Sequence, residues 1–258
     1  MISTFTKAFK QLSSLRSRAV SRHTAPLEEF TEHDREMVQF YSHFVRPGGL
    51  CFDVGANIGN RVKIFLNLGA RVVAIEPQDA CINILKQQFG KNQNCELIQT
   101  ALGASEGKAE MLISDANTIS SLSPEWIKSV KASGRFSEYT WDKKQTISIT
   151  TLDTLIGKYG QPSFIKIDVE GFEFEVVSGL SKPVKFLSFE FTPEFLESTR
   201  SVISHLQHLG DARFNYCLGE SMELKLPEWV DAATIKKILS GFEGDTTVFG
   251  DVYVRFPV

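Results

Sequence analysis

Short apolar runs alternate along the chain with segments whose apolar residues recur every three or four positions. The apolar runs predict buried strands, at 50–54, 71–75, 95–99, 164–171 and 184–191. The periodic segments predict helices, at about 60–68, 79–89, 172–180 and 194–209. Two closing strands are predicted, at 213–218 and 248–256. Strands that are apolar on both faces and alternate with helices are typical of a parallel sheet covered on both sides.

An amphipathic helix is predicted before the first strand. Thr31 and Asp34 have the spacing of a capping box, in which each side chain accepts a hydrogen bond from the other residue's backbone. Pro47 and the two glycines after it end the helix. Because this helix precedes the strand–helix alternation, we expect a helical extension over 1–46 and a main domain over 47–258.

Residues 1–25 carry five basic residues and no acidic residue. Their apolar residues fall at helical spacing, so the segment is both basic and amphipathic. We interpret it as a surface helix. Peripheral contact with a membrane or a partner protein, and an organelle transit peptide, are the alternatives.

A long polar segment at 114–144 interrupts the alternation, between two extra strands predicted at 107–113 and 145–150. Connections of this length are commonly functional lids. We therefore expect a lid over a substrate. Its aromatic residues could stack on a sugar ring or could simply pack the segment down; they are Trp126, Tyr139 and Trp141.

Acidic residues lie at the ends of predicted strands, at Asp53, Glu76, Asp168, Glu170 and Glu190. In an open parallel sheet, ligands bind outside the carboxyl ends of the strands. These acids are therefore expected to surround one site.

A glycine-bearing turn follows the first strand, with Gly55 and Gly59 before a helix. Such a turn offers close backbone approach and free N–H groups. The dinucleotide pattern G-x-G-x-x-G is missing, so an adenosine-bearing ligand other than NAD is indicated. The alternative is a corner whose glycines serve packing only.

Lys166, Asp168 and Glu170 alternate along one predicted strand, which would place them on one face. A charged trio on a buried strand is costly unless it is paired or faces a pocket. A purely structural lysine–carboxylate pair is the alternative.

Composition narrows the function further. The chain has 258 residues, 42% of them hydrophobic, and a net charge of −3, which is unlike a general nucleic-acid binder. Its four cysteines are scattered, so we expect no disulfide, no zinc and a reducing, cytoplasmic location. No run approaches the roughly 18 apolar residues of a membrane span.

Four short sequences, in this order, resemble the FkbM family of methyltransferases. They are D-V-G-A-N-I-G at 53–59, A-I-E-P at 74–77, T-L-D-T-L at 151–155 and K-I-D-V-E-G at 166–171. The resemblance extends from about 50 to 191, and A-N-T-I-S-S-L at 116–122 is similar to a family loop near the cofactor. It implies a Rossmann-like class I methyltransferase over 47–258. That fold is an α/β sheet of seven strands, mostly parallel, with helices on both faces and an antiparallel last strand. The implied cofactor is S-adenosyl-L-methionine.

The resemblance also implies roles for single residues. The cofactor's methionine part would be held by Asp53, Gly55, Ala56, Asn57 and Gly59. Its ribose would lie on Glu76, beside Pro77, and its adenine beside Thr100 and Ala101. Asp168 and Glu170 match the acidic motif at the reacting centre, where Asp168 also contacts the cofactor.

Family members mostly methylate hydroxyl groups, so we expect O-methylation of a sugar, glycan or secondary metabolite. Asp168 is the first candidate for the base, followed by Glu170 and Glu190. We expect no metal, although several acids together could hold Mg²⁺. His205 and His208 are assigned to a solvated helix face.

Two other functions are weighed against this one. An NAD-dependent oxidoreductase would use the formal Y-x-x-x-K at 139–143, but this falls in a polar segment rather than a helix. A non-enzymatic nucleotide-binding module on the same fold is the second alternative.

Overall fold

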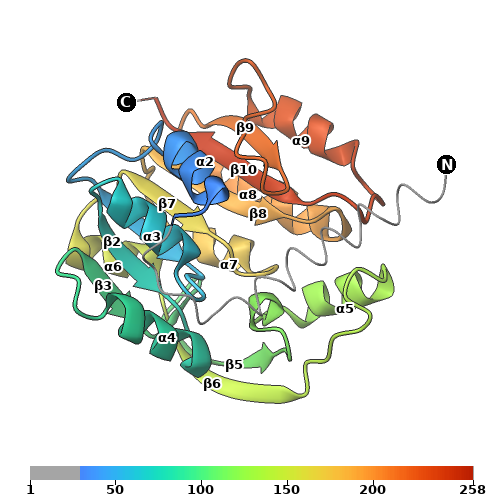
Figure 1. Ribbon diagram of the computed structural model, residues 1–258. Helices are drawn as coiled ribbons and strands as arrows, with labels where there is room; N and C mark the ends of the chain where they lie inside the picture. Colours follow the sequence, from blue (N-terminus) through green and yellow to red (C-terminus); the bar gives the residue numbers. More distant parts are fainter. Residues whose placement is uncertain (1–29, 258) are drawn as a thin grey trace. The chain divides into compact units, whose positions relative to one another are not determined.

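The computed structural model describes residues 30–257, and the chain from Thr31 onward forms one compact unit. Its main sheet has the strand order β3-β2-β1-β7-β8-β10-β9 (Figure 1). The strands are β1 Leu50–Val54, β2 Arg71–Ile75, β3 Cys95–Ile98, β7 Phe164–Ile167, β8 Phe186–Phe191, β9 Arg213–Leu218 and β10 Gly250–Arg255. β10 is antiparallel to both of its neighbours, and the other pairs are parallel. This confirms the expected seven-stranded sheet with an antiparallel last strand.

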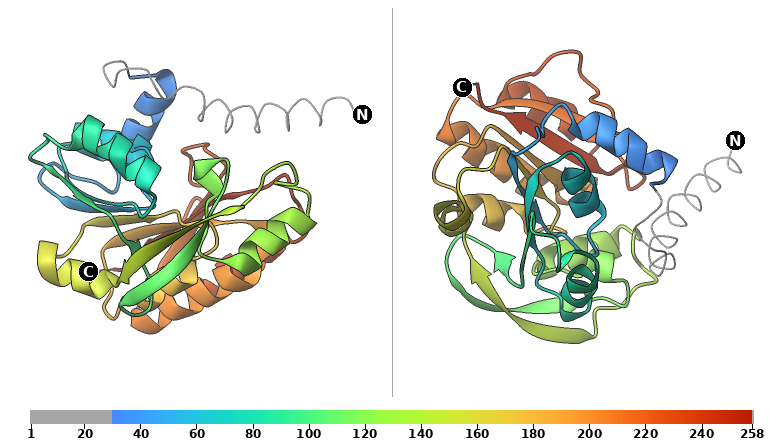
Figure 2. Two further views of the ribbon diagram at one scale, coloured as in Figure 1. Left: turned by 90° about the horizontal axis from the view of Figure 1, so that it is seen from below. Right: turned by 60° about the vertical axis from the view of Figure 1, so that its left-hand side comes forward.

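Helices cover both faces of this sheet (Figure 2). One face carries α2 Glu32–Tyr41, α3 Asn60–Asn67 and α4 Asp79–Phe89. The other carries α6 Leu152–Tyr159, α7 Glu173–Ser178 and α8 Leu196–Leu209, with α9 Ala232–Ser240 packed beside α8. In the described residues, no helix is long and apolar enough to span a membrane.

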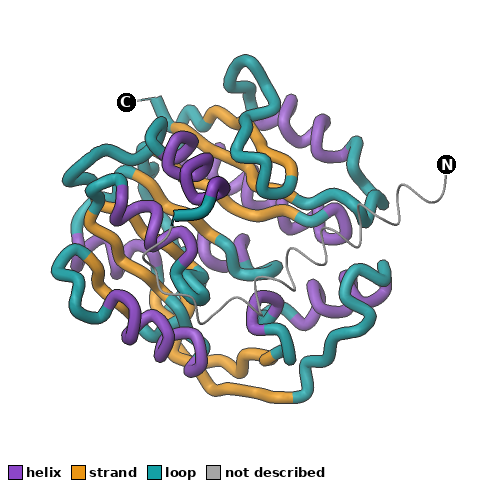
Figure 3. The backbone as a smooth tube through the Cα atoms, in the orientation of Figure 1, coloured by secondary structure: helices purple, strands orange, loops and turns teal. Residues whose placement is uncertain are grey.

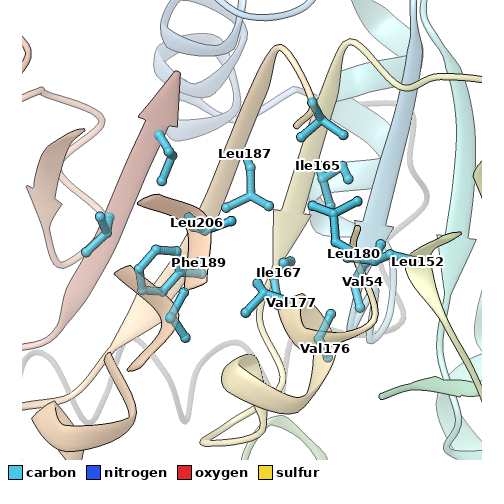
Figure 4. Packing of buried hydrophobic residues seen from close by; sticks show 14 of the residues in the cluster. Val54, Leu152, Ile165, Ile167, Val176, Val177, Leu180, Leu187, Phe189 and Leu206 are labelled. Carbon is cyan, nitrogen blue, oxygen red and sulfur yellow. The ribbon is translucent and has the colours of Figure 1, made fainter. Parts of the chain in front are cut away.

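The larger core lies between the sheet and α6 to α9. Ile165 and Ile167 of β7 point into it together with Phe189 of β8, where they meet Val176 and Val177 of α7 (Figure 4). Residues at alternate positions of a strand point to opposite faces, so the other residues of β7 pack on the opposite face of the sheet.

The opposite face is aromatic. Phe44 stacks on Phe164 and Tyr253, with ring centroids 5.6 and 5.3 Å apart. Tyr41 of α2 meets Phe65 of α3 edge to face. The α2 helix is thus packed against the sheet.

The predicted capping box of α2 is confirmed. Thr31 Oγ1 accepts a hydrogen bond from Asp34 N at 3.1 Å, and Asp34 Oδ2 accepts one from Thr31 N at 2.7 Å. The basic segment 1–25 lies outside the described residues.

A second sheet of three strands has the order β4-β6-β5. Its strands are β4 Ala101–Leu102, β5 Gly107–Ile113 and β6 Lys143–Thr150, so both predicted extra strands are present. Between β5 and β6, the segment holds the short 3-10 helix η1 Asn117–Ile119 and α5 Pro124–Ala132. The pattern of apolar residues does not predict α5, although Ser123 caps it by accepting a hydrogen bond from Trp126 N at 3.1 Å.

The connection from β9 to β10 contains a second missed helix, α9, in an otherwise irregular stretch (Figure 3). Its cap is also readable, since the side chain of Asp231 accepts a hydrogen bond from Thr234 N at 2.8 Å. Short helices flanked by polar loops give little apolar periodicity, and here the cap is the better signal.

The predicted strand 164–171 is wrong in its second half. β7 ends at Ile167, and Glu170 and Gly171 have φ of 53° and 89°. The backbone therefore leaves the sheet in a turn, and Lys166, Asp168 and Glu170 do not share one strand face.

Candidate active site

The turn after β1 is bent by left-handed backbone at Gly55 (φ 81°), Asn57 (φ 49°) and Gly59 (φ 94°). A Cβ atom on Gly55 would collide with the carbonyl oxygen of Asp168, and one on Gly59 would collide with the ring of Phe89. Both glycines are thus required by contacts within the protein, as the packing alternative supposed. The same contact brings the β1 turn directly against the turn after β7.

Glu76 follows β2 and lies against this glycine turn. Its two carboxylate oxygens accept hydrogen bonds from Asn57 N and Gln78 N, both at 2.8 Å. The side chain is buried, and burial raises the pKa of Glu76 to about 7 despite these bonds. Each oxygen keeps a second lone pair, which ribose hydroxyls can use.

Asp53 lies next to the end of β1, on the α2 and α3 face of the sheet. Burial raises the pKa of Asp53 to about 7, against the attraction of Lys166 and Arg61. Within residues 30–257, neither Asp53 Oδ2 nor Asn57 Oδ1 has a hydrogen-bond partner, although both atoms are buried. Buried acceptors without donors are costly, so this pair fits a ligand that brings N–H or O–H groups.

The segment after β5 covers the Glu76 side of this turn. The carbonyl oxygen of Asn117 accepts hydrogen bonds from Gln78 Nε2 at 3.0 Å and from Asn57 Nδ2 at 3.5 Å. Its amide donates to Cys81 Sγ at 3.3 Å. Asn117 and Gln78 were missed as single residues, although the A-N-T-I-S-S-L sequence indicated this loop.

Thr100, Ala101 and Pro77 lie where the main sheet joins the small one. Thr100 Oγ1 donates to the carbonyl oxygen of Ser148 at 2.8 Å, which ties β4 to β6. Ala101 is buried, and the carbonyl of Pro77 accepts a hydrogen bond from Gln145 Nε2 at 2.8 Å. These contacts lie within the protein and join the two sheets.

Asp168, Glu170 and Glu190 come together at the carboxyl ends of β7 and β8. One carboxylate oxygen from each residue lies within 4.8 Å of the others. The Asp168 side chain is 40% exposed, whereas Glu170 and Glu190 are buried. The same donor set also suits a hard divalent cation, the alternative stated above.

Glu173 at the start of α7 supports this acidic cluster and was not predicted. Its Oε1 accepts hydrogen bonds from Val169 N at 3.3 Å and Gly171 N at 3.2 Å. Burial raises the pKa of Glu173 to about 7. An acid in the first turn of a predicted helix, just after K-I-D-V-E-G, is the signal that could have found it.

A pocket opens beside Glu190, beneath α5. Trp126, Glu173 and Thr192 are among the residues that line it. Trp126 Nε1 donates to Thr192 Oγ1 at 3.3 Å, and its ring occupies the space that a side chain on Gly171 would need. This small polar pocket borders the acidic cluster.

An ion pair attaches the segment around α5 to the residues after β8. Arg135 bonds the carboxylate of Glu194 through two nitrogens, at 2.6 and 3.1 Å, and both side chains are less than one-tenth exposed. Trp126 belongs to a separate small core, against which Tyr139 and Trp141 pack. The contacts of these three aromatic residues are those of the packing alternative.

His205 and His208 lie on α8 and bond backbone carbonyls, of Leu180 at 3.1 Å and Ser204 at 2.6 Å. Neither histidine belongs to the acidic cluster. Tyr139 lies in a loop and Lys143 begins β6, so the formal Y-x-x-x-K does not lie on a helix.

Comparison with known proteins assigns the chain to a family. Residues 53–214, more than half of the chain, match the Methyltransferase FkbM domain. No curated protein matches the chain.

Solved structures resemble the fold at low identity. An O-methyltransferase from Bacillus cereus in complex with SAH is 11% identical, with 97% of this chain and 91% of that chain covered and a TM-score of 0.44. A putative methyltransferase from Streptococcus mutans in complex with SAH is 11% identical, covering 88% and 99%, with a TM-score of 0.44. A precorrin-6y C5,15-methyltransferase from Geobacter metallireducens is 10% identical, covering 90% and 93%, with a TM-score of 0.44.

The glycine turn, the acid after β2 and the acidic turn after β7 all lie inside the matched region. The chain therefore belongs to the FkbM family and is an S-adenosylmethionine-dependent methyltransferase.

Proposed function

We propose that this methyltransferase acts on a hydroxyl group of a sugar, a glycan or a secondary metabolite. One observation carries the proposal: three carboxylates, of Asp168, Glu170 and Glu190, converge within 4.8 Å beside the glycine turn. A hydroxyl attacks better when a base removes its proton, and carboxylates both accept hydroxyl hydrogen bonds and take protons. The net charge of −3 argues against a nucleic-acid acceptor.

The cofactor would lie across the glycine turn. The buried oxygens of Asp53 and Asn57 offer acceptors for the amino group of its methionine part, and Glu76 offers acceptors for its ribose. When bound, S-adenosylmethionine supplies a methyl group already activated by its sulfonium. The chain then has to orient the acceptor, exclude water and take the proton.

Asp168 is the first choice for the base. Its carboxylate is partly exposed, and Lys166 Nζ lies 3.3 Å from Oδ2. In the described part of the chain, no group donates a hydrogen bond to Oδ1. That oxygen is available to an acceptor hydroxyl, while Glu170 and Glu190 lie close enough to orient the same group.

The test is a methyl-transfer screen read by mass spectrometry. Purified chain and S-adenosylmethionine are incubated with a panel of sugars, glycans and hydroxylated aromatic compounds, and with amines and thiols for comparison. We expect methyl ethers from hydroxyl acceptors and a loss of about two orders of magnitude in turnover for Asp168→Asn.

The matched control is Asp211→Asn, which removes an exposed carboxylate that pairs with Arg213. It should transfer methyl groups at the wild-type rate. Methylation of amines or thiols alone would refute the acceptor class. Wild-type turnover by Asp168→Asn would refute the base.

A further inference from the structure

We propose that Asp251, on strand β10, is a positioning residue of the reacting centre. It holds the ammonium of Lys166, and through Lys166 it fixes the carboxylate of Asp168. Asp251 lies outside residues 53–214 that match the family. The inference rests on the proposed function for the part that Asp168 takes in transfer.

Lys166 Nζ has a complete set of acceptors. It donates to Asp251 Oδ1 at 2.9 Å, to Asp168 Oδ2 at 3.3 Å and to the carbonyl oxygen of Ile167 at 3.5 Å. An ammonium has three donors, so every donor is used and the group has one preferred orientation. Lys166 is 1% exposed, which leaves water no access to compete for these bonds.

The strand register explains how the two side chains meet. Lys166 is directly opposite Ser188 on β8, and Asp251 on β10 is directly opposite Glu190. β8 therefore separates the partners, and the lysine side chain has to cross over it. Ser188 is small and fully buried at the crossing point, where a larger side chain would occupy the path.

Other charged and titratable groups surround this bridge. They are Tyr41 on α2, Arg61 on α3, Asp53 on β1, Tyr253 on β10 and Glu220 in the loop after β9. Burial alone would lower the pKa of Lys166, but the charges of Asp168 and Asp251 raise it well above its ordinary value. The bridge is thus a cation between two carboxylates, and removing one carboxylate leaves the cation to the other.

This arrangement explains the orientation of Asp168. Lys166 Nζ donates to Oδ2 and not to Oδ1, so one carboxylate oxygen is held by the bridge. Because the ammonium also bonds Asp251, Asp168 is oriented by Lys166 without being its only carboxylate partner. Without Asp251, the ammonium would move toward Asp168 and change the orientation of the Asp168 carboxylate.

The first measurement needs no acceptor. Protein carrying ¹³C-carboxyl aspartate is compared at one fixed pH, and the Asp168 resonance is assigned by its loss in Asp168→Asn. We expect Asp251→Asn to shift the Asp168 resonance. Lys63→Met is the matched control, because it removes a partly buried ion pair with Asp34 (2.7 Å) on the same face of the sheet, without contact with Asp168. An Asp168 resonance unmoved in folded Asp251→Asn would overturn the inference.

The second measurement uses an acceptor from the transfer screen. For Asp251→Asn we expect kcat to fall on the order of 10- to 100-fold with the KM for S-adenosylmethionine unchanged. A general loss of structure would instead weaken cofactor binding as well. Lys166→Met should lower kcat in the same way. If Lys166→Met does not fold, the result for Asp251→Asn alone tests the inference.

The two proposals fail separately. Full turnover by Asp168→Asn removes the base from the proposed function, while a shifted Asp168 resonance still reports the bridge. An unchanged resonance and kcat in Asp251→Asn remove the bridge, while a loss of turnover in Asp168→Asn still supports the base.

Discussion

Glu173 Oε1 accepts a hydrogen bond from the backbone N–H of Gly171 at 3.2 Å. The same oxygen accepts one from Val169 N at 3.3 Å, so a single buried side chain spans the turn that carries Asp168 and Glu170. Backbone donors in such a turn have no strand partner, and the carboxyl group replaces one.

Glu173→Ala should therefore lower the free energy of unfolding by about 1–3 kcal/mol, because two partly buried N–H groups lose their acceptor. Glu173→Gln keeps an oxygen in place and should cost much less. Urea unfolding of the three proteins measures both values. Equal losses for the two variants would show that the charge, not the acceptor, matters.

Asp53→Asn should stabilise the cofactor-free protein at high pH. The folded-state pKa of Asp53 is raised by burial to about 7 from an ordinary 3.8, so the folded chain binds the proton more tightly than the unfolded chain. That contribution to stability is present at low pH and is lost as pH rises from about 4 through about 7.

At pH 8, Asp53→Asn should then raise the free energy of unfolding by roughly 1–3 kcal/mol, with little difference near pH 4. Its affinity for adenosylhomocysteine should fall, since Asn replaces with an amide the carboxylate that we propose to bind the amino group of the cofactor. Urea titrations at both pH values and calorimetric binding measure these effects. A less stable variant at pH 8 contradicts the account.

Gly171→Ala and Gly134→Ala form a matched pair. Both glycines have similar left-handed backbone, with φ of 89° and 84°. A Cβ on Gly171 would collide with Trp126, whereas one on Gly134 would meet no atom within 4 Å. We expect Gly134→Ala to cost about 1 kcal/mol from backbone strain alone and Gly171→Ala about 2 kcal/mol more. Thermal unfolding compares them, and equal costs would mean that Trp126 moves aside freely.

Adenosylhomocysteine should stabilise the chain and NAD should not. At 100 times its dissociation constant, a ligand adds about 2.7 kcal/mol to the free energy of unfolding. For a domain of this size, that corresponds to a rise of about 5–10 °C in Tm. A rise with NAD instead would contradict the cofactor, and Glu76→Ala should abolish the rise with adenosylhomocysteine.

The local pattern of apolar residues was sufficient to predict the elements around the glycine turn. β1, β2 and α4 have the predicted bounds. A strand buried on both faces gives a continuous apolar run, and a helix buried along one stripe gives an apolar residue every three or four positions, so both are visible in the sequence. The turn at 168–171 was hidden, since V-E-G continues an alternating strand pattern and only the backbone at Glu170 breaks it.

Contacts between distant segments were out of reach. Lys166 and Asp251 are 85 residues apart and meet only because β10 inserts between β8 and β9. Likewise, the acids Asp168 and Glu190 could be placed at one edge of a sheet, but not within 4.8 Å of each other. The sequence pattern shows which edge of the sheet carries the acidic residues, whereas the strand order decides which side chains are in contact.

The backbone contact between Gly55 and the carbonyl of Asp168 couples cofactor binding and proton removal, the two functions proposed for these turns. A side chain on Gly55 would collide with the Asp168 carbonyl, so the proposed cofactor site and the proposed base lie on turns that are in direct contact. A displacement of either turn would therefore displace the other. The hypothesis that the segment around α5 covers the substrate then predicts that new acceptors are accommodated by changes in that segment, while the contact between the two turns stays as it is.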